Sequence, residues 1–296
     1  MTTVALLVAG LLSGCGSDSP GAHGGVIRIV AAENFWGSIA AQIGGSSVQV
    51  TNLIDSPSVD PHDYEPTPAN ARAVATADLI VVNGAGYDAW AGKLVGASSA
   101  GGKVLDVATL VGAKNGDNPH RWYNPGDVHA FTTALTAELK RLDPTHASSY
   151  EARLTTFQTQ GLKQYDALIA QIKSRYAGTP VGASESIFSM LAPSLGLNLI
   201  TPVGFLKAIS EGSDVSAADK ATIDRQIASR QIKIYVYNSQ NATPDIQAQI
   251  KECKARGIPT ATVTETMSPA SATFEQWQSA QLTGIERALA TATGRS

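Results

Sequence analysis

Short apolar runs alternate with helix-like segments along almost the whole chain, and this alternation limits the possible folds more than any other feature. Runs rich in Val, Ile and Leu favour buried strands, and helices between consecutive strands are typical of a parallel sheet covered on both faces. We therefore predict an α/β fold with mostly parallel sheets. The predicted strands cover residues 26–32, 48–54, 79–83 and 103–107 in the first half, and 180–184, 198–203, 232–237 and 259–263 in the second.

A long helical pattern separates the two sets of strands. Between residues 145 and 177 apolar side chains recur at helical spacing, no proline interrupts them, and Gly161 is the only glycine. Such a helix would span roughly 50 Å, which suits a rod that packs along two lobes and limits their hinge motion. The predicted organisation is an N-terminal α/β lobe at 26–142, a connecting helix at 143–177 and a C-terminal α/β lobe at 178–296, with a cleft between the lobes.

The composition argues against two classes of protein. The chain has 296 residues, of which 43% are hydrophobic and 16% charged, so it can build a large core and is not disordered. A formal net charge of −3 gives no electrostatic basis for a nucleic-acid partner. After the N-terminal segment, no run approaches the roughly 18 apolar residues that a membrane-spanning helix needs.

The first 15 residues resemble a bacterial lipoprotein signal peptide. An apolar run at 4–12 is followed by Ser-Gly and then Cys15, and a flexible linker rich in Gly and Ser extends over 16–25. Lipid attachment at Cys15 would anchor the protein to the outer face of the bacterial cell membrane. The absence of Lys and Arg from the apolar run departs from such signals, and an ordinary secretory signal is the alternative. The only other cysteine, Cys253, lies in a helical pattern and is interpreted as a packing residue.

Two histidines follow prolines in loops of the first predicted lobe. His62 lies in the segment Asp-Pro-His-Asp-Tyr-Glu after the second strand, and His120 lies in Asn-Pro-His-Arg-Trp-Tyr before a helix. Open α/β sheets bind their ligands at the carboxyl ends of the strands, and proline restricts the backbone of a loop that must aim a side chain. A single histidine is more often an ordinary hydrogen-bonded group, so neither motif alone establishes a metal site.

Two glutamates occupy comparable positions in the second predicted lobe. Glu185 follows the strand at 180–184, and Glu265 follows the strand at 259–263. Taken singly, Glu185 could be a helix cap and Glu265 a solvated loop acid. Together with the two histidines they would supply imidazole nitrogen and carboxylate oxygen from both sides of the cleft. This donor set suits Zn²⁺ or Mn²⁺, and the absence of thiolates disfavours Cu(I) and iron–sulfur clusters.

The two histidine motifs, the lipoprotein-like start and the long helix resemble the substrate-binding lipoproteins of zinc and manganese ABC importers, over nearly all of residues 26–293. The resemblance implies a binding protein that is not an enzyme. It would capture one Zn²⁺ or Mn²⁺ ion per chain in the cleft between the lobes and deliver it to an ABC-transporter membrane permease. It also implies an anchored extracytoplasmic protein, which we expect to be a monomer.

The resemblance also implies which residues hold the metal. The ligands would be His62, His120, Glu185 and Glu265, although the family commonly has Asp at the last position. The stretch 63–119 has no histidine, whereas zinc binders of the family often carry a His-rich loop there, and two carboxylates resemble the manganese branch. Metal-bound imidazoles usually need a partner for their other nitrogen. The candidates for such neighbouring roles are Tyr64, Glu65, Asn118 and Trp122.

Three other functions compete with this interpretation. The segment Gly84-Ala-Gly-Tyr-Asp-Ala89, with Asp106 downstream, matches a dinucleotide-binding fingerprint, but Asp88 would place negative charge where a pyrophosphate must bind. A metallohydrolase would hold zinc by three protein ligands and keep a position open for water. A metal-stabilised adhesin would bind its partner even after losing the metal.

Overall fold

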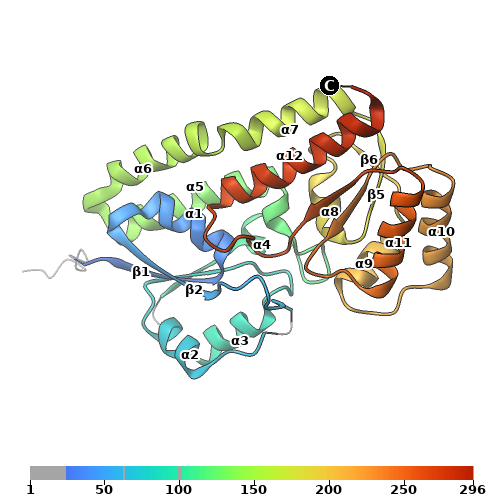
Figure 1. Cartoon of the computed structure of the whole chain (residues 1–296). Coiled ribbons are helices and arrows are strands. Elements are labelled where there is room, and N and C mark those ends of the chain that lie inside the picture. Colours follow the sequence, from blue (N-terminus) through green and yellow to red (C-terminus); the bar gives the residue numbers. More distant parts are fainter. Residues whose placement is uncertain (1–24, 63, 99–101, 296) are drawn as a thin grey trace, which may run out of the picture.

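The chain forms two four-stranded parallel sheets, one in each lobe (Figure 1). This computed structural model describes residues 25–62, 64–98 and 102–295. The two sheets share one strand order, β2-β1-β3-β4 and β6-β5-β7-β8, and the predicted α/β fold with two lobes is confirmed. The strands are β1 (Ile27–Glu33), β2 (Val48–Ile54), β3 (Leu79–Val82), β4 (Lys103–Asp106), β5 (Pro180–Ala183), β6 (Asn198–Leu199), β7 (Tyr235–Asn238) and β8 (Thr260–Val263).

Helices cover the sheets because the central strands are apolar on both faces. All four residues of β3 are buried, and Arg28 is the only exposed residue of β1. The helices around the first sheet are α1 (Asn34–Gly44), α2 (Pro68–Ala75), α3 (Ala89–Ala97), α4 (Val107–Leu110) and α5 (Pro125–Leu142). Those of the second lobe are α8 (Ser186–Leu191), α9 (Val203–Ser210), α10 (Ala217–Ala228), α11 (Pro244–Ala255) and α12 (Phe274–Thr293).

A helical rod runs along one side of both lobes. It consists of α6 (Ala147–Thr156), a π-helical turn η4 (Phe157–Gly161) and α7 (Lys163–Tyr176), and α12 lies beside α7 (Figure 1). The sequence predicts one helix over 145–177, and the structure divides it at Gly161. A side chain at Gly161 would meet the Phe157 ring at 3.3 Å, so glycine leaves room for that ring at the wider turn.

The main hydrophobic core is shared by the two lobes. Phe35 of α1 stacks on Trp122 with ring centroids 4.1 Å apart, and Trp277 of α12 lies 6.4 Å from Phe35. All three rings are almost completely buried. Since α12 follows the second sheet in the chain, its aromatic residues join the second lobe to the core of the first.

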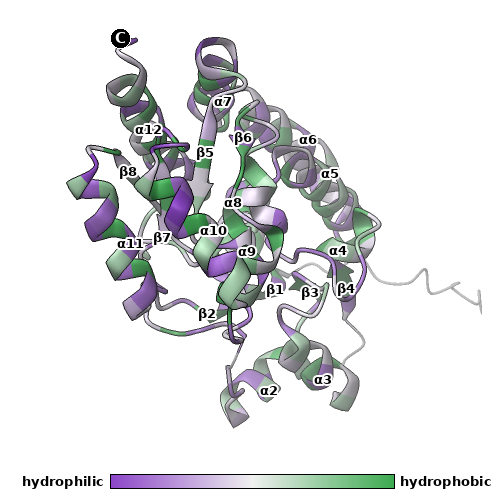
Figure 2. Cartoon of the chain, turned by 90° about the vertical axis from the view of Figure 1, so that its right-hand side faces the viewer, coloured by the Kyte–Doolittle hydropathy of each residue, from purple (hydrophilic) through white to green (hydrophobic). Residues whose placement is uncertain are grey.

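The largest error of the sequence analysis in this region lies after β5. The predicted strand at 198–203 ends at Leu199, and Val203 begins helix α9, which was not predicted. Helix α9 buries Phe205, Leu206 and Ile209 within only eight residues, too few for the helical period to stand out. Cys253 is buried in α11, which confirms its interpretation as a packing residue. In Figure 2, α10 and α11 carry both hydrophilic and hydrophobic residues, as expected of helices with one buried face.

The predicted signal peptide, Cys15 and the linker up to residue 24 lie outside the described residues. Within the described ranges, no helix has both the length and the apolar character needed to span a membrane.

Candidate metal centre

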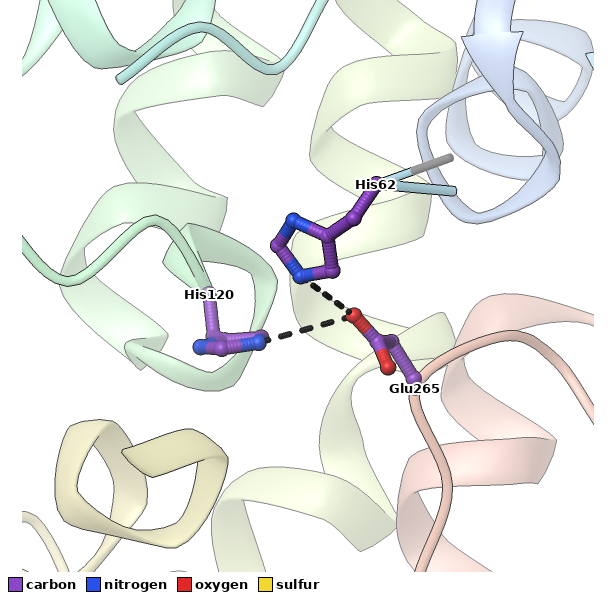
Figure 3. Close-up of side chains that lie close together, drawn as sticks. All are labelled: His62, His120 and Glu265. Atoms are coloured by element: carbon purple, nitrogen blue, oxygen red, sulfur yellow. Dashed lines mark ion pairs between the residues drawn. The ribbon is translucent and has the colours of Figure 1, made fainter. Parts of the chain in front are cut away.

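Three side chains from the two lobes converge on one point (Figure 3). His62 lies in the loop between β2 and α2, His120 in the loop before the short 3₁₀ helix η2 (Arg121–Tyr123), and Glu265 just after β8. The Glu265 Oε1 atom lies 3.2 Å from His62 Nε2 and 3.7 Å from His120 Nε2. One potential ligand atom from each residue lies within 4.8 Å of the other two. This spacing suits a cation held by two imidazoles and a carboxylate.

The His120 loop presents the Nε2 atom of the imidazole to this point. Asn118 Oδ1 accepts a hydrogen bond from the His120 backbone N–H at 3.1 Å and lies 2.8 Å from Nδ1. An N–H at Nδ1 would donate to Asn118, which leaves the lone pair of Nε2 free for a metal. The Asn118 amide also donates to the Ser186 carbonyl at 2.7 Å and to Ser189 Oγ at 2.9 Å, so the same residue links this loop to the second lobe.

The His62 loop is fixed by its neighbours, although the His62 side chain remains 29% exposed. Asp60 Oδ1 accepts a hydrogen bond from the His62 backbone N–H at 2.9 Å. The Trp90 indole donates to the Pro61 carbonyl at 3.0 Å. His62 is therefore the ligand candidate nearest to solvent, while His120 and Glu265 lie deeper.

The electrostatics of the three side chains are coupled. Burial lowers the pKa of His62, but the neighbouring Glu265 carboxylate outweighs burial and raises that pKa. Burial lowers the pKa of His120, which is completely enclosed. Burial raises the pKa of Glu265, yet the two neighbouring histidines outweigh burial and lower it to about 2. Glu265 is therefore a carboxylate at any pH at which the protein would bind metal.

Glu185, the fourth residue of the predicted set, is not part of this group. It is buried between β5 and α8, and its Oε2 accepts a hydrogen bond from Asn238 Nδ2 at 3.0 Å. Burial and the negative charge of Glu265 raise the pKa of Glu185 to about 8. Its Oε1 atom is buried without a hydrogen-bond partner. A divalent cation beside Glu185 would favour its carboxylate form, because the positive charge would offset the repulsion between the Glu185 and Glu265 carboxylates.

The residues expected around the histidines differ in their placement. Besides Asn118, Trp122 contacts His120, with ring centroids 5.3 Å apart. The Tyr64 hydroxyl instead donates to the Leu53 carbonyl at 3.2 Å and to Asn70 Oδ1 at 2.9 Å, so it serves neither imidazole. Glu65 is exposed on the loop.

Tyr87 contacts both imidazoles and was missed by the sequence analysis. Its ring is edge-on to His62 at 4.8 Å and to His120 at 5.9 Å, and it is 1% exposed. The signal in the sequence is the Gly-Ala-Gly-Tyr turn at the carboxyl end of β3, which also matches the dinucleotide-binding fingerprint.

The structure argues against a dinucleotide at that turn. Asp88 Oδ2 accepts the backbone N–H of Asn83 at 2.7 Å, and Oδ1 accepts that of Gly84 at 2.9 Å. The carboxylate thus occupies backbone donors of the turn that a pyrophosphate would need.

A cavity of about 590 Å³ opens beside the two histidines, between the lobes. Its walls include His62, Gly86 and His120 from the first lobe, and Ser186 and Leu206 from the second. The candidate centre therefore lies beside an interlobe cavity whose wall includes both of its histidines.

Two parallel α/β lobes, a helical rod and a His-His-Glu cluster between the lobes define the class of two-lobed, metal-binding solute-binding proteins. More specifically, residues 29–288 match the family model described as zinc-uptake complex component A, periplasmic, and the chain belongs to this family.

Two curated relatives illustrate the sequence similarity. The manganese-binding lipoprotein MntA of Halalkalibacterium halodurans is 28% identical over 161 residues, which cover 52% of this chain and 53% of that protein. This match spans about half the length of the relative. The manganese ABC transporter substrate-binding lipoprotein PsaA of Streptococcus pneumoniae serotype 4 is 26% identical over 214 residues, covering 66% of this chain and 68% of that protein.

Solved structures share the fold. A manganese-bound S38A variant of a periplasmic metal-binding protein from Candidatus Liberibacter asiaticus superposes with a TM-score of 0.75 at 21% identity, covering 89% of this chain and 99% of the other. The binding protein FpvC of Pseudomonas aeruginosa, in complex with Mn²⁺, has a TM-score of 0.72 at 21% identity, covering 89% of this chain and 98% of the other.

Proposed function

We propose that this protein captures one Mn²⁺ or Zn²⁺ ion between its lobes and delivers it to the membrane permease of an ABC importer. The observation that carries the proposal is the convergence of His62, His120 and Glu265, because His120 Nε2 and Glu265 Oε1 are buried and have no hydrogen-bond partner among the residues that the structure describes. Buried polar atoms are normally satisfied, so two such atoms facing one point indicate a ligand.

The donor set favours a borderline or hard divalent cation. Imidazole nitrogen suits Zn²⁺ and Mn²⁺, and each carboxylate added to the set favours Mn²⁺ relative to softer metals. Relatives named for manganese support Mn²⁺ as a cargo. Zn²⁺ should nevertheless bind the isolated protein more tightly, because affinity at a given site rises from Mn²⁺ to Zn²⁺ along the first transition row.

The remaining parts of the proposal concern how the protein works in the cell. Relatives named as lipoproteins of ABC transporters support an anchor at Cys15 and a position outside the cytoplasm. We propose that the protein acts as a monomer and performs no catalysis, since the ion itself is the cargo.

A competitive titration tests this function. The segment 25–296 should bind one equivalent of metal, with Zn²⁺ displacing Mn²⁺. Separately, a bacterial strain that lacks the chain should lose high-affinity uptake of radiolabelled Mn²⁺ or Zn²⁺ and regain it with the wild-type gene. Absence of tight binding to either ion would refute the proposal.

Acid should release the metal. Because Glu265 raises the pKa of His62, this imidazole is protonated at pH 5, and a bound ion must displace that proton. The apparent affinity should fall at least about tenfold for each pH unit below the His62 pKa, and more steeply when Glu185, with a pKa of about 8, must also lose a proton. Glu265, with a pKa of about 2, stays ionised throughout and cannot cause the effect. Titrations at pH 7, 6 and 5 measure it, with circular dichroism as the control for folding; equal affinities would argue against histidine ligands.

A further inference from the structure

Packing of the aromatic ring does not explain why the residue at position 87 of the metal centre is a tyrosine. The ring packs against both imidazoles and lies 4.9 Å from the Trp122 ring, so it forms part of the wall of the site. A phenylalanine would fill that space equally well. The hydroxyl, however, is buried and has no hydrogen-bond partner among the described residues. A buried hydroxyl without a partner costs free energy, so its retention indicates a use.

The turn that carries Tyr87 is held in an uncommon conformation. Gly84, Ala85 and Gly86 have φ angles of 77°, 54° and 86°, and Ala85 is one of only two non-glycine residues with positive φ among the described residues. Positive φ is unfavourable for alanine, so the surroundings must impose it. The Asp88 carboxylate, which binds the Asn83 and Gly84 N–H groups, closes this turn. The consequence is that Tyr87 is aimed at the histidines by a rigid support.

The Tyr87 ring lies against the two imidazoles whose Nε2 atoms are 3.2 Å and 3.7 Å from Glu265 Oε1, so the hydroxyl and the Glu265 carboxylate belong to the same buried group of side chains. Burial raises the pKa of Tyr87 well above its ordinary value, and the negative charge of Glu265 is the next largest cause. A phenol is protonated at neutral pH even without such a shift, so Tyr87 can act as a hydrogen-bond donor. Glu265 Oε1 faces both imidazoles, but a carboxylate has two oxygens and can accept from a further donor.

We propose that Tyr87 is the positioning residue of the metal centre: its hydroxyl donates to the Glu265 carboxylate when a cation binds, and holds one carboxylate oxygen toward the ion. This inference rests on the proposed function. A cation between the three ligands would replace the contacts between Glu265 Oε1 and the imidazoles. The Glu265 carboxylate could then bind the cation through one oxygen or through both. The Tyr87 hydrogen bond selects binding through one oxygen and so limits the coordination number.

The test compares two Tyr→Phe substitutions in the same lobe. Tyr87→Phe keeps the ring and removes the hydroxyl, and should weaken Zn²⁺ and Mn²⁺ binding by about 10- to 100-fold, the range found for groups that orient metal ligands. Tyr64→Phe is the matched control, because the Tyr64 hydroxyl bonds Leu53 and Asn70 away from the site. It should leave the affinity unchanged. With Co²⁺ as a spectroscopic probe, Tyr87→Phe should weaken the visible absorption bands, since a second carboxylate oxygen raises the coordination number.

A double-mutant cycle separates positioning from other roles. If Tyr87 acts through Glu265, then Tyr87→Phe should weaken Zn²⁺ binding in the wild type but have no further effect in a Glu265→Ala background. Equal losses in both backgrounds, or wild-type affinity and Co²⁺ spectrum for Tyr87→Phe, would overturn the inference while leaving metal capture intact. Failure of the wild-type protein to bind Zn²⁺ or Mn²⁺ would instead refute the proposed function.

Discussion

Replacing His120 with alanine is expected to abolish tight metal binding. The imidazole is 1% exposed, its Nε2 points at Glu265, and Asn118 fixes its orientation. The substitution removes a ligand atom and leaves a space that no neighbouring donor fills. The affinity should fall by more than about 100-fold, beyond the loss expected for an outer partner of a ligand. Competition with a chromophoric chelator measures the loss for Zn²⁺ and Mn²⁺.

His129→Ala is the matched control for this substitution. His129 lies on α5 of the same lobe, its side chain is 40% exposed, and its Nε2 lies 3.8 Å from Asp166. Its removal should leave the metal affinity unchanged, because it is not among the converging ligands. Thermal unfolding of both variants without metal checks that the fold is retained. Wild-type affinity in folded His120→Ala would mean that the buried histidine has only a structural role.

Glu265→Ala should weaken metal binding about as strongly, whereas the effect of Glu185→Gln depends on the number of ligands. Glu265 is already ionised and contacts both imidazoles. Glu185, with a pKa raised to about 8, is mostly protonated at pH 7 and must lose that proton before its carboxylate can bind an ion. We expect Glu185 to join the centre when metal binds, so Glu185→Gln should weaken binding by at least about 10-fold.

Calorimetry in buffers of different ionisation enthalpy measures the protons released on binding at pH 7. Wild-type protein should release more protons than Glu185→Gln, because the glutamine has none to lose. Equal proton release and equal affinity for the two proteins would contradict a fourth ligand and leave a three-residue centre.

The sequence predicts the architecture well because strands and helices of this fold have strong local patterns. Six of the eight predicted strands match observed strands to within one residue at each end, and the strand predicted at 232–237 begins only at Tyr235. The two loops with histidines follow from proline and from their position after strands. The prediction of a strand at 198–203 was wrong because β6 has only two residues and α9 begins soon after it. Both elements are too short to show a strand or helix periodicity in the sequence.

Features that depend on three-dimensional contacts could not be predicted. The sequence places Glu185 and Glu265 in equivalent positions, yet Asn238 holds one of them and two histidines hold the other. The role of Tyr87 depends on a turn whose glycines are visible but whose direction is set by Asp88. Local sequence patterns identify the loops that carry potential metal ligands, but which of these side chains come together depends on tertiary packing.

The last helix has a consequence for the order in which the chain can fold. Trp277 and Phe274 of α12 belong to the core that encloses Phe35 of α1, and the Phe274 N–H donates to Ser38 Oγ at 3.0 Å. During synthesis this apolar surface of α1 stays exposed until α12 has been made. The core of the first lobe is therefore completed only after the second lobe and α12 have been synthesised.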